Sequence, residues 1–294
     1  MTNAVVWYDQ NSSKVWAAAD SLLTAKTTSG EQTSISRVTD QAMKVLRLQV
    51  SAWGKTQYSV ADGPMISYDV GMVYAGAVTP ALMTYSAAAM MLSNLHPQTE
   101  ENQRIFTPEF SGVADLIRYL SERYTRDASL AYSFDNIPFC EFVIFAVPPD
   151  DILNSLPLEC YWIHPNINSM GEFSQIVERV DLLGGEVAVI GDDTNNLRSE
   201  INRLLARPCN CHTHPCNCHI GREPRVALEA RMRARKHDTV GGTLQFGVLY
   251  ENRMNIFGSM NNEYGDPIQN WLGFNLKTEI DSILGMSVKI PSLD

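Results

Sequence analysis

The sequence has little positive charge. Its 294 residues include 23 Lys and Arg against 33 Asp and Glu, which gives a formal net charge of −10. Broad binding to nucleic acid or to an anionic membrane surface requires clustered Lys and Arg. We therefore expect neither nucleic acid nor membrane among the partners, while a hydrophobic share of 45% is enough to build a globular core.

Signals for export or membrane insertion are also missing. Residues 1–13, MTNAVVWYDQNSS, contain neither a basic leader nor a long apolar core. The longest apolar tract, residues 70–92, is interrupted by two Thr, a Ser and a Pro and is rich in small residues. A membrane span would be more uniformly apolar, so we interpret the tract as a strand that runs into a buried helix. We expect a cytoplasmic protein.

Cysteine is scarce outside one short segment. Cys140 and Cys160 lie in apolar runs, where small buried thiols are common, and the other four cysteines fall within PCNCHTHPCNCH at 208–219. In a reducing compartment such cysteines are thiols or metal ligands. Their spacing differs from the C-x₂₋₄-C pairs of standard zinc fingers, but thiolate and imidazole groups suit Zn²⁺, and soft thiolates suit Cu(I).

This segment therefore predicts a structural metal site, with zinc as the first candidate. The alternative is a polar loop that binds metal only adventitiously. The candidate ligands are Cys209, Cys211, Cys216, Cys218, His212, His214 and His219.

The apolar pattern predicts strands and paired helices. Two strand-like runs at 4–9 and 14–20, joined by the turn QNSS, are typical of a hairpin. Further strands are expected at 42–50, 68–77, 140–147, 158–165, 186–193 and as a pair within 241–258, and helices at 80–95, 110–127, 195–206 and 224–238. This order lacks the βαβα alternation of a doubly wound sheet. It favours an α+β fold, a four-layer αββα sandwich.

Several candidate catalytic residues lie near the start of the chain. Thr2 directly follows Met1, and methionine aminopeptidases generally remove Met before a residue as small as Thr. An N-terminal Thr carries both a hydroxyl nucleophile and an α-amine that can act as its base. Asp20 ends the second strand, Lys44 opens an alternating strand, and Gly76 ends a buried one.

These residues resemble, in type and order, those of the proteasome β-subunit family, which includes the peptidase subunit of the bacterial ATP-dependent two-component protease. The resemblance rests on Thr2, on Ala18-Ala19-Asp20 followed by Thr24, on Lys44 and on Ala75-Gly76. VIGDD at 189–193 stands where the family has a Gly-Ser-Gly turn, and HDTVGG at 237–242 where it has Asp-x-x-Ser-Gly-Gly. The similarity spans about residues 2–257 and implies an N-terminal nucleophile (Ntn) hydrolase.

The resemblance implies a role for each matching residue. Thr2 Oγ would attack a carbonyl carbon, and the free amine would accept the proton through a water. Lys44 would lower the pKa of the nucleophile or the amine, and Asp20 would orient Lys44 and Thr2 by charge-assisted hydrogen bonds. The backbone N–H of Gly76 would form the oxyanion hole. No cofactor is needed for this chemistry.

Four further positions follow from the same resemblance. Thr24 and Val78 would hold an extended peptide by strand-like hydrogen bonds. Asp192 and Asp238 would complete the polar network around the amine. Asp192 stands where the family usually has Ser, and Val240 or Gly241 stands where it has a second Ser.

The choice of Lys44 has one competitor. The separation between Thr24 and Lys44 is longer than in the family, and Arg37 fits that spacing with almost no gap. We favour Lys44 because a basic residue that opens an alternating strand is the family pattern. Arginine is always protonated, so Arg37 could supply charge but could not exchange protons.

The resemblance also predicts the organisation of the protein. We expect a hydrolase domain at 2–257 with a Cys/His-rich insertion at 208–220, followed by a C-terminal extension at 258–294. A self-compartmentalising homo-oligomer would act on a peptide or unfolded protein, with an ATPase partner of unknown identity. The alternatives are a catalytically inactive scaffold of the same fold and a metal-binding protein.

Overall fold

The computed structural model describes most of the chain. The described residues are 2–29, 32–53, 63–96, 107–132, 137–149, 158–206, 221–234, 239–257, 259–261, 268–271 and 274–275. Within them the fold is mixed, with β-sheets and four α-helices. The predicted mixture of helices and strands is therefore confirmed.

The first sheet contains the predicted N-terminal hairpin. Its five strands lie in the order β10-β1-β2-β11-β12. Their bounds are β1 Asn3–Asp9, β2 Lys14–Asp20, β10 Ala188–Gly191, β11 Leu244–Tyr250 and β12 Arg253–Phe257. Trp7 and Trp16 are directly opposite each other in the hairpin and stack with ring centroids 6.2 Å apart. This cross-strand pair fixes the register that brings the start of β1 beside the end of β2.

The second sheet is a meander of antiparallel strands in the order β5-β6-β7-β8-β9. Their bounds are β5 Val45–Ala52, β6 Ile66–Gly76, β7 Cys140–Ala146, β8 Glu159–Ile167 and β9 Phe173–Arg179. The first four were expected from their apolar runs. β9 was not, because FSQIVER mixes polar and apolar residues as an edge strand does.

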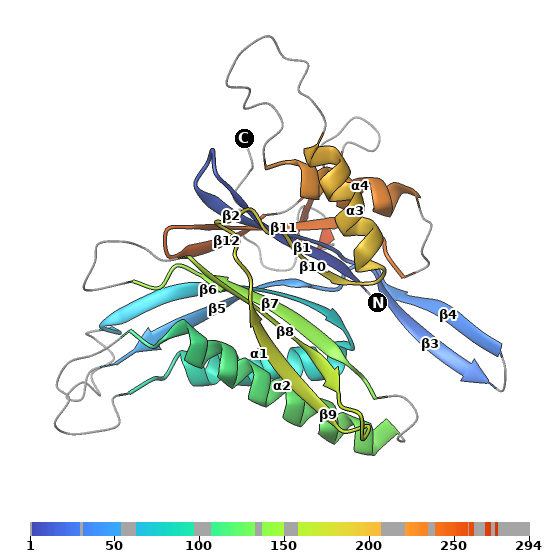
Figure 1. Cartoon of the computed structure of the whole chain (residues 1–294), viewed down its shortest axis with the longest axis horizontal. Coiled ribbons are helices and arrows are strands. Elements are labelled where there is room, and N and C mark those ends of the chain that lie inside the picture. The colour runs from blue at the N-terminus through green and yellow to red at the C-terminus, as the bar shows by residue number, and fades with distance from the viewer. Residues whose placement is uncertain are drawn as a thin grey trace, which may run out of the picture.

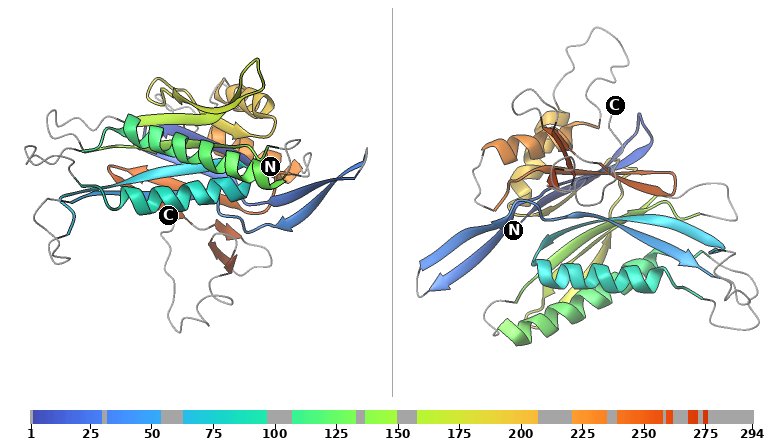
Figure 2. Two further views of the ribbon diagram at one scale, coloured as in Figure 1. Left: turned by 90° about the horizontal axis from the view of Figure 1, so that it is seen from below. Right: turned by 180° about the vertical axis from the view of Figure 1, so that it is seen from behind.

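The helices pack in two pairs, one against each sheet (Figures 1 and 2). α1 Val78–Leu92 and α2 Phe110–Tyr132 share one apolar core with the second sheet. α3 Thr194–Leu205 and α4 Glu223–Ala234 share another core with the first sheet. A third core, built from both sheets, lies between them and includes Ala4, Val6, Val73 and Phe145.

Two smaller units extend from this body. β3 Leu23–Ser29 and β4 Gln32–Thr39 form a hairpin that projects beyond the first sheet (Figure 1). Its polar sequence gave no strand prediction. Beyond residue 257, β13 Ser259–Asn261, β14 Ile268–Trp271 and β15 Phe274–Asn275 form a three-stranded sheet. Among the described helices none has the length and apolar character needed to cross a membrane.

Candidate active site

A buried ion pair lies where the two sheets meet near the chain start. Lys44 Nζ donates to Asp20 Oδ1 at 3.0 Å, and both side chains are 0% exposed. Lys44 precedes β5 of the second sheet, while Asp20 ends β2 of the first, so the pair joins the two sheets. Lys44 Nζ also donates to the Leu22 carbonyl at 2.6 Å.

Burial opposes charge on both members of this pair. It lowers the pKa of Lys44, and the neighbouring Asp20 carboxylate counters that shift. It also raises the pKa of Asp20, against the opposing effects of Lys44 and of backbone N–H donors from Gly241 and Asn3. Because one pKa falls and the other rises, the two groups are brought closer to proton exchange than they would be in water.

Asp20 reaches the candidate nucleophile through the backbone. Its Oδ1 accepts the N–H of Asn3 at 2.9 Å, and its Oδ2 accepts the N–H of Gly241 at 3.0 Å. Thr2 immediately precedes Asn3 and is 3% exposed. Ala4 and Val6 of β1 face the space between the sheets, so the alternation of the strand points the Thr2 side chain to the same side.

The Thr2 carbonyl is held by the turn after β10. It accepts the N–H of Asp192 at 2.9 Å and the Asn3 Nδ2–H at 3.2 Å. Gly191 has φ +106°, and a Cβ at this position would collide with the Thr2 carbonyl oxygen. Only glycine tolerates both this backbone conformation and this close approach.

Asp192 therefore lies beside Thr2. The Thr239 hydroxyl donates to Asp192 Oδ2. The negative charge of Asp192 also raises the pKa of Lys44, although less than the charge and hydrogen bond of Asp20 do. Asn3 Nδ2 also donates to the Asp192 carbonyl at 2.8 Å. Asp238 lies outside the described residues.

Gly76 is at the same end of the second sheet as Lys44. The Tyr74 N–H donates to the Lys44 carbonyl, and Gly76 ends β6 two residues later with φ +94°. A Cβ there would collide with the Phe139 carbonyl. Val78 begins α1, and Thr24 lies in β3 opposite Arg37 of β4.

Arg37 is not part of the buried ion pair. Its guanidinium forms an ion pair with Asp40, and its side chain is 62% exposed. Lys44, and not Arg37, is the basic residue in contact with Asp20.

Two supporting residues were missed by the sequence analysis. Gln245 of β11 accepts the Lys44 N–H at 2.8 Å and donates to the Ala42 carbonyl at 2.8 Å. Asn3 ties Thr2 to Asp192, as described above. Their partners Ala42, Lys44 and Asp192 are distant from them in sequence, so no local pattern marks them.

The predicted metal ligands at 208–220 lie outside the described residues. In the ranges that the structure describes, no group of three or more His, Cys, Asp or Glu side chains is arranged to hold a metal ion. Cys140 and Cys160 are buried and free. The metal site stays a prediction.

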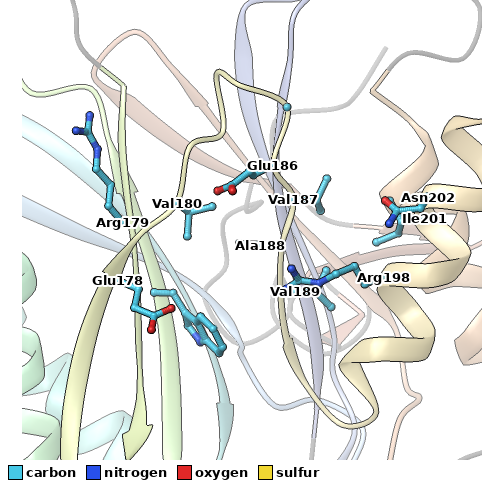
Figure 3. A pocket seen from close by; sticks show the side chains of 12 residues that line it. Glu178, Arg179, Val180, Glu186, Val187, Ala188, Val189, Arg198, Ile201 and Asn202 are labelled. Carbon is cyan, nitrogen blue, oxygen red and sulfur yellow. The ribbon is translucent and has the colours of Figure 1, made fainter.

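A separate pocket of about 350 Å³ opens between β9, β10 and α3. Figure 3 shows Glu178 of β9 and Arg198 of α3 on facing walls, with Val189 of β10 between them. Trp162 of β8 also lines it. None of the candidate catalytic residues belongs to its lining, so the pocket is a neighbour of the site and not its substrate cleft.

Comparison with solved structures shows a likeness of fold. Over 90% of its length the chain is similar to the Anbu protein of Pseudomonas aeruginosa, solved as a helical assembly, with 13% identity, 88% coverage of that chain and a TM-score of 0.50. At this identity the likeness concerns the fold alone.

Two further structures are similar. Anbu (ancestral beta-subunit) from Yersinia bercovieri is 13% identical, with 100% of this chain and 99% of that chain covered and a TM-score of 0.49. BPH of Thiobacillus denitrificans, solved in complex with epoxomicin, is 12% identical, with 86% and 100% covered and a TM-score of 0.43. No protein-family model and no curated protein matches the sequence.

Proposed function

We propose that the protein is a threonine-dependent hydrolase of amide or peptide bonds, with Thr2 as the N-terminal nucleophile once Met1 is removed. The observation that carries the proposal is the fully buried Asp20–Lys44 pair, bound through Asp20 to the N–H that follows Thr2. A buried ion pair is a weak source of stability because both charges lose their hydration. Its position beside an N-terminal threonine therefore favours a chemical role.

In the proposed reaction Thr2 Oγ attacks the carbonyl carbon of the substrate. The freed α-amine of Thr2 accepts the hydroxyl proton through a water, and the same proton later goes to the leaving amine. Lys44 provides positive charge that disfavours protonation of the amine, and Asp20 keeps Lys44 and the Thr2 backbone in register.

The remaining roles come from the resemblance to the proteasome β-subunit family and are part of the same proposal. The Gly76 N–H would stabilise the oxyanion, and Asp192, with Asp238, would bind the amine. Thr24 and Val78 would hold the substrate as an extended strand. The substrate would be a peptide or an unfolded protein, since strand-like hydrogen bonds require an extended chain.

We also propose the finer organisation. The three cores between paired helices and two sheets support a four-layer αββα sandwich over residues 2–257. The insertion at 208–220 would bind Zn²⁺ as a structural clip, and 258–294 would be an extension. The helical assembly of the Pseudomonas aeruginosa Anbu protein supports a homo-oligomer, here in the cytoplasm, with any ATPase partner still to be identified.

Hydrolysis of a panel of fluorogenic peptide amides tests the function. The wild type should cleave at least one of them, and Thr2→Ala should lose the activity by about 10³-fold or more while keeping its fold and assembly state. Cleavage that survives Thr2→Ala contradicts the proposal. If the assembled wild type cleaves nothing and forms no adduct with a peptide vinyl sulfone, the inactive scaffold is the better description.

The zinc clip has its own test. Purified wild type should contain about one zinc per chain by elemental analysis, and replacement of Cys209, Cys211, Cys216 and Cys218 by Ser should remove it. Equal zinc content in the two proteins would contradict the metal site without touching the proposed hydrolase.

A further inference from the structure

An acidic side chain enters the space between the sheets beside the candidate active site. Glu141 lies on β7, whose alternation places it on the same face as Val143 and Phe145 of the inter-sheet core. It is half-buried. Burial raises the pKa of its carboxyl, while hydrogen bonds from Gly191 and Trp162 oppose the shift. A carboxyl group in this position must have specific partners.

Each carboxylate oxygen of Glu141 accepts a hydrogen bond, and the two donors lie on different strands. Oε1 accepts the Gly191 N–H at 2.8 Å, and Oε2 accepts the Trp162 Nε1–H at 3.0 Å. Gly191 ends β10 in the first sheet, whereas Glu141 and Trp162 belong to the second. The carboxyl group therefore ties the two sheets together.

This tie acts at the backbone that holds Thr2. Gly191 lies against the Thr2 carbonyl so closely that no side chain fits between them. The next residue, Asp192, donates its N–H to the same carbonyl oxygen. Any shift of Gly191 relative to the second sheet therefore moves Thr2 as well.

The proposed reaction needs groups from both sheets. In the first sheet, Thr2 directly precedes β1 and Asp20 ends β2; in the second, Lys44 directly precedes β5 and Gly76 ends β6. A displacement of about 1 Å between reacting groups can cost on the order of 100-fold in rate. The contacts that hold one sheet against the other at this end therefore determine how precisely the reacting groups are placed.

We infer that Glu141 is a positioning residue, which holds the Gly191–Asp192 turn, and through it Thr2, in register with Lys44 and Gly76. This inference rests on the proposed function and deepens it. Trp162 supports the same carboxyl group, since its indole N–H fixes Oε2 while its ring stacks on His164 at 3.9 Å between centroids. The other ionisable groups that act on Glu141 are His164 of β8 and Asp192.

Glu141→Gln tests the inference with little change in size. The amide keeps one oxygen, so one of the two N–H donors faces an NH₂ group and loses its acceptor. The rate constant for modification of Thr2 by a peptide vinyl sulfone, and kcat for peptide hydrolysis, should fall about 10- to 100-fold, with KM within about twofold of wild type. A role in stability alone would lower the melting temperature and leave kcat of the folded enzyme unchanged.

Trp162→Phe is the matched control. It removes the second donor but keeps an aromatic ring against His164 and leaves the Gly191 hydrogen bond in place. It should reduce kcat by less than about threefold, because the Gly191 contact carries the positioning. Glu141→Asp, which keeps the charge but shortens the reach, should lie between these variants and replaces Glu141→Gln if the latter does not fold.

Amide hydrogen exchange gives a readout that needs no activity. In Glu141→Gln, residues 188–192 and 2–6 should exchange about tenfold faster or more than in wild type, while β5 stays unchanged. If wild type is inactive but Glu141→Gln still shows this faster exchange, the positioning role of Glu141 is supported and the proposed function is contradicted. If exchange and, in an active enzyme, kcat both match wild type, Glu141 has no positioning role.

Discussion

The space between the two sheets is apolar through its middle and polar at one end. In the middle, Val6, Val73 and Phe145 are fully buried, and Phe145 lies over Gly71, where any side chain would collide with its ring. At the end beside Thr2, the same layer contains Asp20 and Lys44, equally buried. The first region stabilises the fold by apolar burial. The second carries charges that a core does not need, and this difference is the reason for our proposal that it serves chemistry.

The largest expected effect comes from breaking the polar end. Lys44→Met leaves the Asp20 carboxylate buried without its counter-charge, so the free energy of unfolding should fall by about 3–5 kcal/mol. Peptide hydrolysis should fall by about 10²- to 10⁴-fold, because the base loses its electrostatic support. Chemical denaturation and a peptide assay measure the two effects.

A double variant separates the effect of an unpaired buried charge on stability from the effect of the ion pair on activity. Asp20→Asn combined with Lys44→Met removes both charges but keeps an acceptor oxygen, and should recover part of the lost stability without recovering activity. Recovery of hydrolysis together with stability would show that the pair is structural.

Phe145→Ala changes the apolar middle instead. Loss of the buried ring should lower the free energy of unfolding by about 3–5 kcal/mol. The kcat of the folded fraction should stay within about twofold of wild type, since the ring is remote from the Asp20–Lys44 pair along the layer. A large loss of kcat with intact folding would contradict this division of roles.

Gly191→Ala tests the close approach to Thr2. The added Cβ would collide with the Thr2 carbonyl oxygen, and the residue would also occupy a left-handed conformation. Gly171→Ala is the matched control, because Gly171 has φ +79° with open space around it. In both variants the free energy of unfolding should fall by about 1–2 kcal/mol, because alanine disfavours a positive φ. Only Gly191→Ala should also lose activity. Equal kcat in the two variants would argue against the turn as part of the site.

The smallest effect concerns Cys140, which lies on the outer face of the second sheet near Thr125. Burial raises the pKa of its thiol from 9.0 to about 12. Because the folded-state pKa is the higher one, its contribution to stability is complete below pH 9 and declines as the pH rises toward 12.

Alkylation of native protein at pH 8 measures this directly. Cys140 should stay unmodified until denaturant is added, as read by peptide mass spectrometry. Rapid native alkylation would mean that the second sheet opens more readily than its packing indicates.

Sequence reasoning located the elements better than the contacts between them. The hairpin of β1 and β2 and the apolar strands β6, β7 and β10 follow from local alternation and composition. The strands β3, β4 and β9 lack that pattern because their sequences mix polar and apolar residues without a regular alternation. Their existence depends on pairing, which local composition does not encode.

In the candidate site, too, local sequence patterns indicate individual residues but not the contacts between them. Asp20 and Lys44 were found because each stands at a strand end in a recognisable order. Asn3, Glu141 and Gln245 were not, because their hydrogen bonds join residues 50 to 201 positions apart or depend on which face of a strand points inward. Such contacts follow only from the packing of one sheet on the other.

The most direct test of the central claim is the mass of the N-terminal peptide after treatment of the assembled protein with a peptide vinyl sulfone. We expect Met1 to be absent and the adduct to lie on Thr2, with no adduct in Thr2→Ala. Full retention of Met1 in a protein that still hydrolyses peptides, or an adduct that persists in Thr2→Ala, would contradict it.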